Sequence, residues 1–492
     1  MKTSTPYILG IDCGQTALKA CVFDICGNEL YSVSAPTDIS HSSDGISSNL
    51  DMELLWKNAC SLLREITQKV SAAKICAVGV SGHGNGIYPI DVEGKAFMPA
   101  ILSTDLNALS VISAWNSDGT ANRIRQKALC APWAGQPAPI LKYLAENFPS
   151  LFKRIRFVLS CADWLTFRLT GVLSTDFGSL GTSGLIDQRK RTADNELSEI
   201  YGIPSLPELI PCAFASGSKI GCISKQTAEE TGLLTGTSVS VGNFDVNACC
   251  IGGGAVDDSH YSVVAGTWSI NAAFTNQPVI SESLFSCNLY GDGKRYISIE
   301  SSPTSAINLE LFLNAHPDLT PADCDILAET ANWRTPDDIL YLPYIKPLPT
   351  MPRLKGGFSG NISEKGLPDK LRILYEGVAM GHRLHIENLK SSGLMRDAVR
   401  ITGGAAKSRI WMQMFADIIG LPIEVPNAHS AGALGAAICA GTAAGMYKSI
   451  EEACSQMIAV QNVFYPMPGR EEFYSQKFSK FLNLIKTQNI EN

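Results

Sequence analysis

The chain has 492 residues, of which 45% are hydrophobic and 18% charged, and its formal net charge at neutral pH is −7. This length exceeds the size at which a single hydrophobic core stops growing, so we expect two domains or more. The mild acidity, without a basic block, argues against nucleic acid as the main partner. The composition favours a soluble protein that acts on small molecules.

Fifteen cysteines are scattered along the chain, with no C-x-x-C pair and no cysteine–histidine cluster at zinc-ligand spacing. An odd, scattered set favours a reducing compartment over a disulfide framework. The sequence shows no signal peptide, and its longest uncharged apolar stretch, Ala431–Met446, is too short to span a bilayer. We expect a cytoplasmic protein that has no membrane segment.

Two apolar runs near the N-terminus, Tyr7–Ile11 and Leu18–Phe23, predict a β-hairpin. Its turn carries a carboxylate, a glycine, an amide and a hydroxyl, and the return strand carries a lysine. These residues are Asp12, Gly14, Gln15, Thr16 and Lys19. Backbone N–H groups around the glycine, the hydroxyl and the lysine suit a phosphate group, and the carboxylate suits Mg²⁺ or its water. The alternative is an ordinary hairpin with a polar turn.

Two later segments offer groups for a polyhydroxylated substrate. The predicted strand Ile75–Val80 runs into a glycine-spaced loop, where His83, Gly84 and Asn85 bring hydrogen-bonding groups and close backbone approach. The segment Ala100–Asp105 predicts another strand, with Asp105 at its tip. The alternatives are a tight turn for the loop and a helix cap for the carboxylate.

A third carboxylate, Asp245, follows the predicted strand Val239–Val241 and enters a helix of small residues. Partial desolvation at this position would raise its pKa, which suits a general base. The alternative is that Asp245 caps the helix. Between these motifs, apolar spacing predicts helices over 51–70, 108–130, 140–147 and 163–169, and a strand over 157–160. We expect Thr175–Leu185 to form a loop and Pro204–Pro211 an exposed connector.

The second half repeats the pattern of the first. Apolar strands Tyr261–Ala265 and Ser269–Phe274 flank a turn that contains Gly266 and Thr267, as in the first hairpin. We also predict a strand over 296–299, helices over 307–313, 370–389, 411–419 and 430–447, and a proline-rich loop over 347–352. We expect the Trp411–Ile419 stripe to pack in the core and Ile423–Val425 to be the final strand.

A strand over 399–401 ends in two glycines, Gly403 and Gly404, with Lys407 just beyond. The order strand, glycine pair, helix places N–H groups of a helix N-terminus where an anion or a ribose phosphate can bind. The segment predicts a nucleotide-binding element.

Taken in order, these motifs resemble those of the FGGY carbohydrate kinases, over roughly Tyr7 to Tyr447. The resemblance implies an α/β protein with two actin-like (ribonuclease H-like) ATPase domains, over residues 1–250 and 251–492, and an active site in the cleft between them. It implies that the enzyme transfers phosphate from Mg²⁺-ATP to a hydroxyl of a small sugar, and that Asp245 is the catalytic base.

The resemblance also assigns the remaining residues. Sugar would bind at His83, Gly84, Asn85 and Asp105. ATP would bind at Asp12, Gly14, Gln15, Thr16, Lys19, Gly266, Thr267, Gly403, Gly404 and Lys407. Mg²⁺ would be held by Asp12 and, through water, by Asp245. Dimers are frequent among related kinases, so a homodimer is expected.

The sugar side departs from the family pattern more than the ATP side. The chain has Asn107 where xylulose and glycerol kinases typically have arginine, and Ser430 where an acidic residue is usual. The family's first-domain lysine is missing near Ile140. The glycine-spaced loop Ser81–Gly86 and the tip Ser103–Asp105 are closer to those of the L-xylulose kinases. We therefore expect the substrate to be a ketopentose such as L- or D-xylulose, with ribulose, a deoxyketohexose or erythritol as alternative substrates.

Two other classes of protein stay open. One is an ATP-dependent switch protein of the actin or chaperone kind, which would share the phosphate hairpins but lack a substrate base. The other is a sugar sensor that binds its ligand without transferring phosphate, a reading that the missing sugar-side residues motivate.

Overall fold

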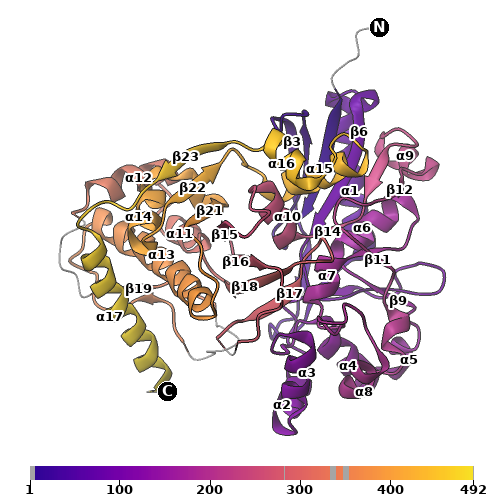
Figure 1. Ribbon diagram of the computed structural model, residues 1–492, viewed down its shortest axis with the longest axis horizontal. Coiled ribbons are helices and arrows are strands. Elements are labelled where there is room, and N and C mark those ends of the chain that lie inside the picture. Colours follow the sequence, from indigo (N-terminus) through magenta and orange to yellow (C-terminus); the bar gives the residue numbers. More distant parts are fainter. Residues whose placement is uncertain (1–5, 282, 333–338, 347–353, 491–492) are drawn as a thin grey trace.

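The computed structural model describes residues 6–281, 283–332, 339–346 and 354–490. Figure 1 shows two lobes side by side, one from the N-terminal part of the chain (indigo to magenta) and one from the C-terminal part (orange to yellow). Each lobe is built around one large sheet. In the described part of the chain, no helix combines the length and the apolar character that crossing a membrane requires.

The first sheet has the strand order β12-β13-β6-β1-β2-β3, and β14 also pairs with β6. Its strands are β1 (Tyr7–Cys13), β2 (Ala17–Phe23), β3 (Glu29–Pro36), β6 (Ile75–Gly82), β12 (Lys219–Cys222), β13 (Ser238–Ser240) and β14 (Asn243–Phe244). β1 is antiparallel to β2 and parallel to β6. This hairpin followed by a parallel strand places the turn after β1 beside the end of β6.

The second sheet has the order β17-β18-β16-β15-β21-β22-β23. Its strands are β15 (His260–Ala265), β16 (Ser269–Thr275), β17 (Ser286–Leu289), β18 (Tyr296–Ser302), β21 (Ala398–Thr402), β22 (Ile423–Pro426) and β23 (Val460–Phe464). Here β15 is antiparallel to β16 and parallel to β21. The hairpin and its parallel neighbour repeat the arrangement of the first sheet, which makes the fold a two-domain, actin-like α/β architecture.

Helices α1 (Met52–Lys69), α6 (Cys161–Thr170) and α9 (Lys225–Thr231) belong to the first lobe, where residues of α1 and α6 share one apolar core with β1, β2 and β6. A separate helical subdomain comprises α2 (Leu109–Ser117), α3 (Thr120–Ala128), α4 (Pro137–Asn147), α5 (Pro149–Phe152), α8 (Asn195–Tyr201) and the 3₁₀ turn η2 (Leu206–Leu209). The small strands are β4 (Ile39–His41), β5 (Ser48–Leu50), β7 (Tyr88–Ile90), β8 (Ala100–Ile101), β9 (Phe157–Leu159), β10 (Thr175–Asp176) and β11 (Ala213–Phe214).

The second lobe packs its helices around Trp411, whose ring stacks on Tyr375 with centroids 4.1 Å apart. Its helices are α11 (Ile307–Asn314), α12 (Pro321–Thr330), α13 (Leu367–Ser391), α14 (Arg409–Ile419) and α17 (Glu471–Ile490), and β19 (Tyr341–Leu342) pairs with β20 (Gly357–Phe358). α16 (Ile450–Met457) packs instead against α10 (Asp245–Gly252) and α15 (Ala431–Ala443). The apolar face of α14 is buried here, so the interpretation of the Trp411–Ile419 stripe as core is confirmed.

Two helices join the lobes. α10 (Asp245–Gly252) and α15 (Ala431–Ala443) pack against each other, and α15 also lies on β1 and β6 of the first sheet (Figure 1). Glycines allow this approach: a Cβ on Gly10 would lie 1.9 Å from the carbonyl oxygen of Ala433, and one on Gly79 would lie 2.0 Å from that of Ala436. The backbone of the C-terminal part is therefore seated directly on the N-terminal sheet.

Several predicted elements differ from the structure. β6 continues through Ser81 and Gly82, and the strand predicted over 100–105 ends at Ile101 because only two residues pair with β5. The helix predicted over 108–130 is two helices, separated at Gly119, whose φ of +82° interrupts helical geometry. The predicted proline-rich loop lies outside the described residues.

Three further expectations were wrong because tertiary packing overrides local composition. The predicted loop 175–185 contains β10 and α7 (Phe177–Thr182), whose first N–H groups are capped by Asp176. The connector 204–211 is not fully exposed, since Leu206 and Leu209 are buried. Ile423–Val425 is not the final strand, because β23 pairs antiparallel with β22. All fifteen cysteines carry free thiols.

The Gly10 contact predicts the effect of one methyl group. Gly10→Ala places a Cβ against backbone atoms that cannot move independently, so we expect a cost of about 3 kcal/mol and a clearly lower thermal midpoint. Gly360→Ala is the control, because that glycine is exposed and its Cβ would lie 3.5 Å from a side-chain atom of Ile339. Equal midpoints for both variants in differential scanning calorimetry would contradict the close packing of α15.

Candidate active site

The turn between β1 and β2 presents its charged groups in register. Asp12 pairs with Lys19 across the hairpin and with Ser81 of the parallel strand β6. The N–H of Gly14 donates to the carbonyl of Ala17 at 2.9 Å, so this glycine closes the turn and does not itself offer a free donor. The Gln15 side chain donates to Ser103 Oγ at 2.7 Å, and Thr16 is exposed at the tip.

The Asp12 carboxylate lies against the first turn of α15. A Cβ on Gly432 would lie 2.3 Å from Asp12 Oδ2, so only glycine leaves room for the carboxylate here. Burial raises the pKa of Asp12, and the Ser81 hydroxyl and Lys19 oppose this shift. Lys19 Nζ lies 3.5 Å from Ser430 Oγ, the position where the family usually has an acid. The lysine charge is therefore not neutralised from that side.

Asp245 is the first residue of α10. The N-cap position is Phe244, so Asp245 does not cap the helix, although its Oδ1 accepts from the N–H of Val246 at 2.8 Å. Burial raises the pKa of Asp245 to about 7, the negative charge of Asp12 raises it as well, and His83 lowers it. The charge of Asp12 therefore acts on Asp245, and the two carboxylates lie in one electrostatic site.

The loop after β6 lies beside Asp245. A Cβ on Gly84 would lie 2.1 Å from the Phe244 ring, so the glycine lets the loop backbone approach the residue that precedes the carboxylate. His83 is 3% exposed and its Nε2 shares a hydrogen bond of 2.8 Å with the Tyr88 hydroxyl. Asn85 has a φ of +59°, and its buried Oδ1 has no partner in the described part of the chain.

A cavity continues from this loop into the first lobe. It is lined by Asn85, Gly86, Ser160, Asp163, Thr175 and Ser179, among others. Apolar side chains such as Leu159, Leu185 and Ile210 also line it, and neither His83 nor Asp245 is among its lining residues. The loop is placed beside Asp245 by the contact of Gly84 with Phe244 and by the effect of His83 on the pKa of Asp245.

Asp105 is held differently from the other predicted sugar ligands. It is 2% exposed, and its carboxylate accepts hydrogen bonds from the backbone N–H groups of Ser48 and Asn107, both at 2.9 Å. The Asn107 amide also donates to it at 3.0 Å. Asn107, which replaces the family's arginine, therefore acts as an internal partner of Asp105. Direct binding of sugar by Asp105 stays a prediction.

The hairpin of β15 and β16 and the glycine pair Gly403–Gly404 lie together in the second lobe. Gly403 has a φ of +100°, and a Cβ there would lie 2.6 Å from backbone atoms of Ala265, just before the turn that contains Gly266 and Thr267. The carbonyls of Gly266 and Thr267 accept from the N–H groups of Ala306 and Ser305, which fixes the turn. Gly404 and Lys407, on the 3₁₀ turn η3 (Gly404–Lys407), are exposed.

Sequence reasoning missed that two buried carboxylates lie close together at the cavity, where Asp163 is one of the lining residues. Burial raises the pKa of Asp163 to about 7, and the charge of Asp176 contributes to that shift. Burial also raises the pKa of Asp176 to about 6, against its bonds to Ser179 and Gly178. The pattern Ser160-x-x-Asp163 is a capping box, which gives a local signal for the helix start, but only the fold brings Asp176 next to it.

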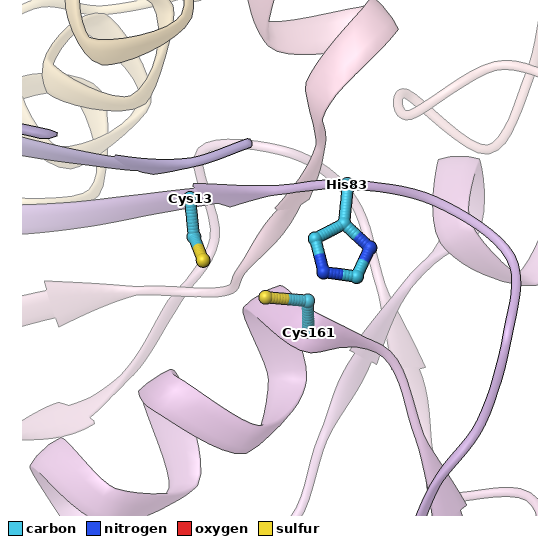
Figure 2. Close-up of side chains that lie close together, drawn as sticks. All are labelled: Cys13, His83 and Cys161. Atoms are coloured by element: carbon cyan, nitrogen blue, oxygen red, sulfur yellow. The ribbon is translucent and has the colours of Figure 1, made fainter. Parts of the chain in front are cut away.

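The second missed feature is a cluster of Cys13, His83 and Cys161, whose ligand atoms lie within 4.8 Å of one another (Figure 2). The three residues are far apart in the sequence and belong to β1, the loop after β6 and α6. No spacing rule for cysteine or histidine could have indicated them.

Two hairpins with glycine-containing turns and a site with two carboxylates, within an actin-like fold, are the arrangement expected of a phosphotransferase of the sugar-kinase class. Models of the FGGY family of carbohydrate kinases match the chain over residues 7–252 for the N-terminal domain and 261–444 for the C-terminal domain. The chain belongs to this family. It is an enzyme that uses ATP to phosphorylate a small sugar, as the sequence predicted.

Individual relatives point in the same direction. The chain is 31% identical over 486 residues to a probable L-xylulose kinase of Haemophilus influenzae, covering 98% of each chain. It is 29% identical to the L-xylulose/3-keto-L-gulonate kinase of Escherichia coli, over 98% of this chain and 97% of the relative. The crystal structure of a ligand-bound xylulose kinase from Lactobacillus acidophilus superposes with a TM-score of 0.88 at 24% identity, covering 98% of each chain.

The Asp163–Asp176 pair predicts how stability depends on pH. Because the folded-state pKa of Asp163 is raised, the native state binds its proton more tightly than the unfolded state, and stability falls as pH rises from about 4 to about 7. Asp163→Asn cannot titrate, so we expect a gain of roughly 4 kcal/mol above pH 7 that vanishes near pH 4.

Thermal midpoints measured across this pH range test the prediction, with the exposed Asp258→Asn as control. Parallel pH profiles for Asp163→Asn and the unsubstituted protein would show that the carboxyl does not titrate in this range.

Proposed function

We propose that this enzyme transfers the γ-phosphoryl group of ATP to a hydroxyl of a ketopentose such as L- or D-xylulose. The observation that carries the proposal is the half-buried carboxylate of Asp245, with its pKa raised to about 7, beside the β1–β2 hairpin and the loop after β6. A carboxylate that is ionised at neutral pH yet still basic suits the removal of a hydroxyl proton.

The reaction follows from the positions of these groups. The loop residues His83, Gly84 and Asn85 orient the sugar so that one hydroxyl faces Asp245. The Asp245 carboxylate takes the proton of that hydroxyl as its oxygen forms a bond to the γ-phosphorus. The bond between the γ-phosphorus and the bridging oxygen breaks, and ADP leaves with the electron pair. Phosphoryl transfer depends mainly on positioning and charge stabilisation, which is what this arrangement supplies.

The ATP phosphates would lie between the two hairpins. Lys19 supplies a positive charge from β2, and the turn of Gln15 and Thr16 supplies polar groups at the tip. On the other side, Gly266, Thr267, Gly403 and Gly404 leave the backbone open to the nucleotide, with Lys407 at the rim. Gly14 contributes by closing the turn rather than by donating to phosphate.

The residues present also fit a magnesium ion. The negative charge of Asp12 raises the pKa of Asp245, and a hard divalent cation next to the two carboxylates would relieve that repulsion. When bound, Mg²⁺ supplies charge neutralisation for the phosphates. Asp12 would hold it from β1, and Asp245 would reach it through water.

The choice of substrate rests on relatives rather than on the pocket. Two relatives that match the whole chain carry L-xylulose in their names. The sugar side of the site retains His83, Gly84 and Asn85 but has Asn107 in place of the family's arginine. Ribulose, erythritol and deoxyketohexoses are the alternatives, and a switch or sensor protein without phosphoryl transfer is the alternative outside catalysis. The cytoplasmic location and the homodimer stay predictions.

ADP release from Mg²⁺-ATP across ketoses, aldoses, polyols and sugar acids tests the substrate. Release with one ketopentose alone would support the proposal and identify the sugar. Release with a polyol or hexose derivative would support kinase activity but contradict the assignment of a ketopentose as the substrate. Absence of sugar-dependent release from folded protein that binds ATP would favour a sensor.

Asp245→Asn removes the base but keeps the size of the side chain. We expect turnover to fall by about 10³-fold, while ATP affinity stays within a fewfold, because proton removal is lost and the hairpins are unchanged. Single-turnover kinetics and nucleotide titration measure the two quantities. Asp258→Asn, an exposed carboxylate near the start of the second lobe, is the matched control. Unchanged turnover in Asp245→Asn would remove this residue from the mechanism.

The raised pKa of Asp245 also predicts the pH profile. The base works only when ionised, so we expect kcat/KM to rise about tenfold per pH unit below pH 7 and to level off above it. Initial rates at low sugar concentration between about pH 5 and pH 9 give the profile. A flat profile across neutral pH would contradict the assignment of Asp245 as a base with this pKa.

A further inference from the structure

Cys13, His83 and Cys161 form a compact cluster at one end of the first sheet (Figure 2). Cys13 is the last residue of β1 and pairs in register with Gly82 of β6, the residue before His83. The N–H of His83 donates to the Cys13 carbonyl at 2.8 Å, which ties the loop to the strand end. Two of the three residues therefore have their backbones fixed against each other.

The third residue is brought in by a glycine. A Cβ on Gly82 would lie 2.7 Å from the backbone nitrogen of Ala162 and 3.1 Å from the Cβ of Cys161. Because Gly82 has no side chain, the first turn of α6 packs directly over the strand end. In Figure 2 the sulfur atom of Cys161 points toward that of Cys13, and one ring nitrogen of His83 faces Cys161.

The cluster is buried but not saturated with hydrogen bonds. Cys13 and Cys161 are 0% exposed and His83 is 3% exposed. The Nδ1 of His83 has no partner in the described part of the chain, while Nε2 shares a hydrogen bond with the neutral Tyr88 hydroxyl, and the ring also interacts with the Cys161 thiol. A buried imidazole next to two thiols, without a carboxylate or carbonyl to fix its tautomer, has an unused capacity to bind a ligand.

We propose that Cys13, Cys161 and His83 bind a thiophilic divalent cation, with Zn²⁺ as the reference ion, at a site distinct from that of Mg²⁺. Two sulfur ligands and one nitrogen ligand are a set that zinc accepts and magnesium does not. In a tetrahedral zinc site these ligand atoms stand about 3.5–3.8 Å apart, so atoms already within 4.8 Å need only small side-chain movements.

Zinc binding would leave one coordination position open, because the chain supplies three ligands. Both cysteines would bind as thiolates, so their two protons are released to solvent as the two Zn–S bonds form, and no electron is transferred. The Tyr88 hydroxyl lies beside the same nitrogen and can turn to a bound water.

Occupancy of this site would inhibit the kinase. Cys13 directly follows Asp12, and His83 is a proposed sugar ligand, so a bound zinc ion would fix the strand end and withdraw the imidazole from the sugar. This inhibitory effect rests on the proposed function, whereas zinc binding itself does not. Bound Zn²⁺ would then lower the affinity for the sugar, and by thermodynamic reciprocity bound sugar would lower the affinity for Zn²⁺.

Binding is tested first, without nucleotide or sugar. The full chain is stripped with a chelator and titrated with Zn²⁺ in competition with a chromophoric chelator, and separately with Co²⁺. We expect one Zn²⁺ per chain and a sulfur-to-cobalt charge-transfer band in the near ultraviolet. Cys161→Ala and Cys13→Ala should each lose the band and weaken Zn²⁺ binding by at least tenfold.

The matched control is Cys324→Ala, since Cys324 is also 0% exposed but lies on α12 of the second lobe. It should bind Zn²⁺ like the unsubstituted protein. Thermal midpoints without metal show whether each variant is folded, and two cysteine variants guard against a folding defect in one. Zn²⁺ binding that is unchanged in both cluster variants, or Co²⁺ binding without the charge-transfer band, would overturn the site.

Activity is tested second, with Mg²⁺ in large excess. Zn²⁺ should inhibit the unsubstituted enzyme and Cys324→Ala alike, while Cys161→Ala should keep its turnover and lose the inhibition. One-to-one Zn²⁺ binding through the cluster without inhibition would support the site and overturn the proposed role of His83 toward sugar. The two proposals therefore fail on different measurements.

Discussion

The close seating of α15 on β1 and β6 is the contact on which the rest of the structure depends. Glycines on both sides remove the side chains that would hold α15 off the sheet, namely Gly10 and Gly79 on the strands and Gly432 on the helix, and Gly435 allows the close approach of α10 to α15. The same approach that packs the lobes together forms one wall of the Asp12 carboxylate site. Packing and chemistry share these atoms, so the site cannot be moved without rebuilding the junction.

The junction also sets the electrostatics of the active site. Asp12 comes from the first hairpin and Asp245 from the helix that packs on α15, and the charge of Asp12 stabilises the protonated form of Asp245. Lys19 is the nearby cation on β2, and it faces the neutral Ser430 rather than an acid. The burial that raises the pKa of Asp12 and of Asp245 therefore acts on two carboxylates that have one nearby lysine in the described part of the chain.

Sequence reasoning captured what is encoded locally. The two hairpins, the helix over 51–70 and the glycine pair at 403–404 have composition and spacing that act within a few residues, and the structure confirms the elements. Sequence reasoning failed where tertiary contacts determine which secondary structure forms. α7 forms despite two glycines because Asp176 caps it, and β23 exists because β22 offers an edge. The site was predictable as a set of motifs, whereas the commitment of Asp105 to Asn107 and the cysteine–histidine cluster required coordinates.

The hydrogen bond from Gln15 to Ser103 has a consequence for how the two substrates bind. In the proposed function the hairpin of Gln15 binds the ATP phosphates, and Ser103 lies two residues before Asp105, a predicted sugar ligand. A ligand that ordered one of these segments would lower the entropy that the other ligand must remove, so ATP and sugar would be thermodynamically linked through this side chain. A residue of the first hairpin thereby connects that turn to the segment before Asp105.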